Sequence, residues 1–73
     1  MYIMETLNTE EFFPLQPLID ELRKKYPQRI WDKFRIKMDL GQLYKAHKIE
    51  KMNMQYIDKN TLQKIDTVGY RKI

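Results

Sequence analysis

The side chains of this sequence that could do chemistry are basic and amide groups concentrated between residues 35 and 59. Lysine and arginine neutralise phosphates, while glutamine and asparagine hydrogen-bond to the edges of bases. Together they predict a surface that binds double-stranded DNA, with the cations on phosphates and the amides probing the grooves. The candidate nucleic-acid-binding residues are Arg35, Lys37, Gln42, Lys45, Lys48, Lys51, Asn53 and Lys59.

Catalytic and metal chemistry is not expected. The chain has no cysteine, no serine and a single histidine, His47, so the usual nucleophile–base pairs and metal-ligand sets cannot be assembled. Carboxylates are adjacent at Glu10/Glu11 and Asp20/Glu21, but neighbours on a helix point in different directions. We therefore expect no enzyme, no catalytic residue, no metal and no cofactor.

Charge is divided unevenly along the chain. Residues 1–22 contain five acids and no Lys or Arg, whereas residues 23–73 contain all 14 basic residues and the other five acids. This division suits a basic face for a polyanion, with the acidic region turned away from it. It also suits a homodimer in which the acidic part of one copy meets the basic part of another. A mixed, solvated surface without a partner is the third interpretation.

The clearest predicted element is a helix that begins near Leu15, accommodates Pro17 in its first turn and ends at Pro27. Its apolar stripe is Leu15, Leu18, Ile19, Leu22 and Tyr26. Residues 28–38 fit either a helix or a strand. We favour a helix with Ile30, Trp31, Phe34 and Met38 on its apolar face.

The second half of the chain predicts a helix-turn-helix followed by a ribbon. A tight turn near 39–41 separates the preceding element from a helix over 40–51 that Asp39 caps. Alternation over 49–57 predicts a small β-ribbon bent around 51–53. Asp58 then caps a last helix over 59–67, which Gly69 ends.

The ends complete the predicted fold. Residues 2–4 are expected to form a strand that pairs with an extended tail at 70–73, and Thr9 is expected to cap a turn of helix. The fold class is thus α+β: a single small helix-turn-helix domain over residues 1–73, with three to four helices and a short β-ribbon. Apolar runs of only a few residues predict no membrane span and a cytoplasmic location.

Three segments resemble the winged-helix excisionases and the DNA-binding domains of MerR-type regulators. These segments are Leu7-Asn8-Thr9-Glu10-Glu11-Phe12, Leu43-Tyr44-Lys45-Ala46-His47-Lys48-Ile49 and Tyr56-Ile57-Asp58-Lys59-Asn60-Thr61-Leu62. The chain departs from that family in a long insertion over 15–38 and in lacking a Gly-rich wing tip. The resemblance implies a winged-helix-like fold and a DNA-binding accessory or regulatory protein of a phage or mobile element, without catalysis.

A protein-binding role is the alternative. The acidic start of the chain, the adjacent Phe12 and Phe13, and five methionines suit a small inhibitor or regulatory factor that docks on a host protein. In this interpretation Phe12 and Phe13 form the binding surface.

Overall fold

The described part of the chain begins with a short helix. The computed structural model describes residues 2–73, and its first element is the short helix α1, Tyr2–Thr6. Ile3, Thr6 and Leu7 are buried, a helical spacing that brings one side of the segment onto α2. The predicted strand at 2–4 is therefore wrong, because burial follows the helical period and not alternation.

A turn held by a side chain replaces the predicted turn of helix at Thr9. The Asn8 Oδ1 atom accepts hydrogen bonds from the backbone N–H groups of Glu10 and Glu11, at 2.9 and 2.7 Å. Asparagine offers the backbone this alternative to a helix. The chain then enters β1, Phe13–Pro14, and Pro14 leads directly into the next helix.

Helix α2, Leu15–Lys25, confirms the clearest sequence prediction. Leu15, Leu18, Ile19 and Leu22 are buried, and Tyr26 packs against the same core. Trp31 lies against this core as well, and its indole Nε1 donates to the Tyr26 carbonyl at 3.1 Å. The loop between the helices is thus fastened by an aromatic anchor.

Helix α3, Lys33–Lys45, is one continuous helix that runs through the predicted turn at 39–41. Asp32, not Asp39, is its N-cap and accepts from the backbone N–H of Arg35 at 3.2 Å. Gly41 inside the helix costs about 1 kcal/mol relative to alanine. Burial of Ile36, Leu40 and Leu43 at i, i+4 and i+7 outweighs that cost and carries the helix across the glycine.

The rest of the chain is a long hairpin. Strands β2, Ile49–Ile57, and β3, Lys64–Lys72, pair antiparallel from Ile49↔Lys72 to Ile57↔Lys64. The predicted bend at 51–53 and the predicted helix over 59–67 are both wrong. Asp58 instead caps the hairpin turn, accepting from the Asn60 N–H at 2.7 Å.

Strand β3 lies in the centre of the sheet. The order is β1-β3-β2, with Phe13 opposite Tyr70 and Pro14 opposite Gly69. The predicted pairing of 70–73 with 2–4 is therefore wrong, since β1 and β2 take both edges of β3. Gly69 does not cap a helix either, because it is a strand residue without positive φ.

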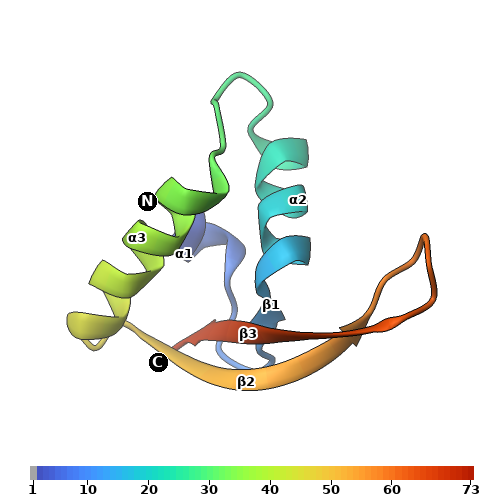
Figure 1. Cartoon of the computed structure of the whole chain (residues 1–73). Helices are drawn as coiled ribbons and strands as arrows, with labels where there is room; N and C mark the ends of the chain where they lie inside the picture. Colours follow the sequence, from blue (N-terminus) through green and yellow to red (C-terminus); the bar gives the residue numbers. More distant parts are fainter. Residues whose placement is uncertain (1) are drawn as a thin grey trace.

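Three helices cover one face of this sheet, and the far half of the hairpin extends beyond them (Figure 1). The architecture is α+β, with three helices and a three-stranded antiparallel sheet among residues 2–73. The fully buried side chains come from the helices and the base of the sheet. They include Ile3, Leu18, Ile19, Leu22, Ile36, Leu40 and Ile49.

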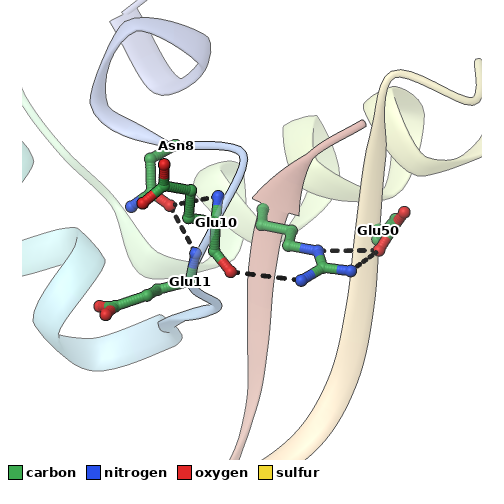
Figure 2. A network of polar contacts seen from close by, with 5 residues as sticks. Asn8, Glu10, Glu11 and Glu50 are labelled. Atoms are coloured by element: carbon green, nitrogen blue, oxygen red, sulfur yellow. Dashed lines mark hydrogen bonds and ion pairs between the residues drawn. The ribbon is translucent and has the colours of Figure 1, made fainter.

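Arg71 fastens the base of the hairpin to the loop before β1. Its guanidinium contacts the Glu50 carboxylate at 2.8 Å and donates to the Glu10 carbonyl at 3.3 Å (Figure 2). The same group lies 4.3 Å from the centre of the Phe12 ring. These contacts hold the loop, β3 and β2 together on the side where Asn8 forms its turn.

Candidate nucleic-acid interface

The outer surface of α3 carries half of the predicted site. Because Ile36, Leu40 and Leu43 fill its inner face, the remaining positions project toward solvent. Arg35, Lys37, Gln42 and Lys45 are all exposed. The structure therefore brings four of the eight predicted residues onto one helix.

These residues lie on two flanks of α3. Positions seven apart fall on nearly the same side of a helix, so Arg35 and Gln42 share one flank. Lys37 shares the other with Tyr44. Lys45 lies between the flanks, so a ligand in front of α3 would meet positive charge on both sides.

An apolar crest separates the flanks. We define the crest as Phe34, Met38 and Gly41, which follow one another at i, i+4 and i+7 opposite the buried stripe. Phe34 is 70% exposed and Met38 is 53% exposed. Sequence reasoning placed both in the core, and this is wrong because α3 turns a different face inward.

The C-terminal end of α3 meets the start of β2 in a basic hollow. The Lys51 Nζ atom lies 4.4 Å from the centre of the Tyr44 ring, a cation–π contact. Lys45 and His47 line the same hollow, with Ile49, Glu50 and Ile73. Lys48 is exposed beside it.

Backbone hydrogen bonds fix the turn that joins these elements. The Lys48 N–H donates to the Leu43 carbonyl and the His47 N–H donates to the Tyr44 carbonyl, both at 3.0 Å. His47 has a φ of 58°, the left-handed conformation in which a helix usually has glycine at this position. The turn sets the direction in which β2 leaves α3, and hence the place of Lys51.

Lys51 and Asn53 continue the basic surface along the strand. They lie on the same face of β2 as Ile49, which is buried in the core. This face is therefore the one turned toward the helices at its base, where Lys51 reaches Tyr44. Asn53 follows it one step further along the hairpin.

Lys59 is separated from the other predicted residues. It belongs to the hairpin turn and lines a hollow against α2, together with Asp20, Glu21 and Lys24. In Figure 1 the hairpin turn and α3 lie on opposite sides of α2. The structure thus groups seven of the eight predicted residues along α3 and the base of β2, and leaves Lys59 beside acidic side chains.

The cations of this surface are not neutralised by carboxylates. Among residues 2–73 the one ion pair is that between Arg71 and Glu50. Helix α3 contains four basic residues and a single acid, Asp39, which is half-buried on the Arg35 side. The surface is therefore positive and has free donors for an anionic ligand.

Phe12 and Phe13, the predicted protein-binding pair, are half-buried. Phe13 packs against the core, and Phe12 lies under the Arg71 guanidinium. Their side chains thus take part in internal packing at the base of the sheet. The large exposed apolar side chains on α3 are the crest residues Phe34 and Met38, together with Tyr44 on the Lys37 flank.

Sequence reasoning missed Tyr44 and the crest as parts of the surface. It took Tyr44 as an apolar helix position and Phe34 and Met38 as core. The seven-residue spacing from Lys37 to Tyr44 was a usable signal, since both lie on one side of a helix. The approach of Lys51 to Tyr44 depends on the turn between the end of α3 at Lys45 and the start of β2 at Ile49.

No group of three or more His, Asp or Glu side chains within residues 2–73 is placed to hold a metal ion. No helix there is both long enough and apolar enough to cross a membrane. Comparison with protein-family models, curated proteins and solved structures found no match.

Proposed function

We propose that this protein is a winged-helix DNA-binding module in which α3 enters the major groove and the β2–β3 hairpin is the wing. The order helix, strand, helix, helix and hairpin, with β3 central, supports this proposal. The sequence resemblance to winged-helix excisionases and MerR-type regulators implies a winged-helix-like fold. In helix-turn-helix proteins the second helix of the pair lies in the major groove, and α3 takes that place after α2.

The observation that carries the proposal is the surface of α3. It combines a buried inner face with an outer face of unpaired cations and one amide. In the proposed complex Lys37 and Lys51 contact phosphates along one flank, and Lys45 contacts a phosphate from its place between the flanks at the end of α3. Arg35 contacts the opposite backbone, and Gln42 reaches a base edge, where glutamine pairs with adenine.

Lys48 and Asn53 extend this interface toward the hairpin, and Lys59 is left out of it. Asp20 and Glu21 line the hollow that Lys59 occupies, and their charges repel phosphate. A role as an accessory or regulatory factor of a phage or mobile element rests on the sequence resemblance alone. The proposed cytoplasmic location rests on the short apolar runs of the sequence.

Salt dependence of binding to duplex DNA tests the proposal. With four phosphate contacts, the logarithm of the association constant should fall with a slope of about −3.6 against the logarithm of salt concentration. Affinity then drops roughly a hundredfold between about 50 and 200 mM salt. Fluorescence anisotropy of a labelled 24-base-pair duplex measures both quantities.

Two charge-matched double variants locate the interface. Lys45→Ala with Lys51→Ala should make the salt dependence shallower, with a slope less negative by about 2 units, since each lost phosphate contact contributes about 0.9. Lys24→Ala with Lys59→Ala removes the same charge from the hollow beside α2 and should leave the slope nearly unchanged. Circular dichroism checks that both variants fold. Equal losses in both, or no binding at low salt, would contradict the proposal.

A further inference from the structure

The apolar crest of α3 is not explained by phosphate binding. Phe34 and Met38 expose most of their side chains at the outermost line of a helix whose flanks are polar. A Cβ atom built on Gly41, the third crest position, would meet nothing within 4 Å. The crest is therefore an open apolar line with room for close approach at Gly41, and Lys45 follows it at the end of the helix.

The charged residues on the two flanks of α3 indicate which kind of partner can contact the crest. Lys37 lies on one side of the crest and Arg35 on the other, and neither is paired with a carboxylate of residues 2–73. An apolar protein surface pressed on the crest would desolvate both cations without compensation. A DNA groove supplies phosphates for the flanks and base edges for the crest.

One group in the major groove matches an apolar side chain. Thymine carries a C5-methyl there, while the other base edges present hydrogen-bond donors and acceptors. Phenylalanine contacts this methyl group in DNA complexes, and methionine is flexible enough to follow it. Gly41 adds no side chain that would hold the helix away from the groove floor.

We propose that Phe34 and Met38 read C5-methyl groups of pyrimidines, so that the protein prefers thymine-containing sites. This inference rests on the proposed DNA-binding function and names the feature of DNA that α3 recognises. Burial of one methyl group corresponds to roughly a fourfold gain in affinity, and burial of two to about 15-fold. The gain is independent of salt, because no charge is involved.

Two pairs of 24-base-pair duplexes isolate the methyl group. The first pair compares alternating A·T with alternating A·U, and the second compares alternating G·C with the same duplex containing 5-methylcytosine. Within each pair the C5-methyl is the difference. In both pairs the protein should bind the methylated duplex more tightly, by a factor of about four or greater. The salt slope should be the same for the two duplexes of a pair.

Variants of the crest assign the preference to these side chains. Phe34→Ala with Met38→Ala should bind both members of each pair equally and keep the salt slope. Phe34→Leu, which retains an apolar contact, should retain part of the preference. Leu62→Ala is the matched control, since Leu62 is 78% exposed at the hairpin turn, away from α3, and its removal should change nothing.

The outcomes separate this inference from the proposed function. Salt-dependent binding with equal affinity for methylated and unmethylated duplexes would overturn methyl recognition and leave DNA binding intact. Absence of binding to any duplex would overturn both. Light scattering that shows a dimer of the wild type, dissociated by the Phe34/Met38 double variant, would assign the crest to a second copy of the chain and overturn methyl recognition.

Discussion

Gly41 and Gly69, the two glycines of the chain, have opposite surroundings. A Cβ atom on Gly41 would be in open space, whereas one on Gly69 would collide with the Met54 sulfur and lie 3.1 Å from the Phe12 Cβ. Glycine inside an exposed helix costs stability because the unfolded chain has more freedom. Glycine in β3 instead makes the space that Phe12 and Met54 occupy.

The same substitution should therefore have opposite effects at the two glycines. Gly41→Ala should raise the free energy of unfolding by about 0.5–1 kcal/mol, and Gly69→Ala should lower it by about 1–3 kcal/mol. Urea denaturation of both variants measures the two changes. If α3 enters the groove crest first, as proposed, the added methyl group of Gly41→Ala holds the helix away from the groove floor. This variant should then bind DNA more weakly although its folded state is more stable. Destabilisation by Gly41→Ala would mean that α3 is not a regular, solvent-exposed helix at this point.

At the scale of the element, the hairpin turn contains an avoidable strain. Leu62 has a φ of 60°, and its N–H donates to the Asp58 carbonyl at 2.7 Å. A left-handed conformation costs a residue with a side chain about 1–2 kcal/mol, and glycine adopts it freely. Leu62 is exposed, so no packing contact offsets this cost.

Leu62→Gly should therefore raise the free energy of unfolding by about 1 kcal/mol, after the added flexibility of the unfolded chain is counted. Leu62→Asn should have a smaller effect of the same sign, because asparagine tolerates this conformation. Thermal unfolding measures both variants, with Leu62→Ala as the control that keeps the strain. A loss of stability in Leu62→Gly would indicate that the leucine side chain makes a contact.

At the scale of the whole molecule, the raised pKa values of two tyrosines make the stability of the fold depend on pH. Burial raises the pKa of the Tyr70 hydroxyl above its ordinary value of 10.0. Partial burial, reinforced by the hydrogen bond donated to Glu5, also raises the pKa of Tyr26. The folded state keeps these protons at pH values where the unfolded chain has released them.

Stability should accordingly decline at alkaline pH. The contribution of both tyrosines is complete below pH 10 and is lost as the pH rises through their raised pKa values. Urea denaturation across this range should give a free energy of unfolding that falls with pH. Tyr26→Phe with Tyr70→Phe removes these two protons and should flatten the decline, leaving the part due to other groups. An unchanged decline in the double variant would contradict this assignment.

The periodicity of the sequence was sufficient to predict an element that buries one continuous apolar face. The stripe from Leu15 to Leu22 recurs at helical spacing with a proline on each side, so α2 follows from the sequence. The positions of the cations on α3 followed as well, because charged side chains avoid the core in either secondary structure. What the sequence determined by itself is thus α2, the α+β class and the basic composition of the candidate surface.

Only the tertiary structure decided where α3 begins and which face it shows to solvent. Asp32 and Asp39 are equally good caps, and Gly41 looks like a break, until burial of Ile36, Leu40 and Leu43 against the other helices and the sheet is included. Because this face of α3 is the buried one, Phe34 and Met38 lie on the opposite face and are exposed. Likewise Lys64–Lys72 became a strand because β1 and β2 offer it backbone partners on both edges. The β1 partner lies far away in the sequence, and β2 pairs with β3 across a turn that begins at Asp58, a residue that the sequence alone also allows as a helix cap.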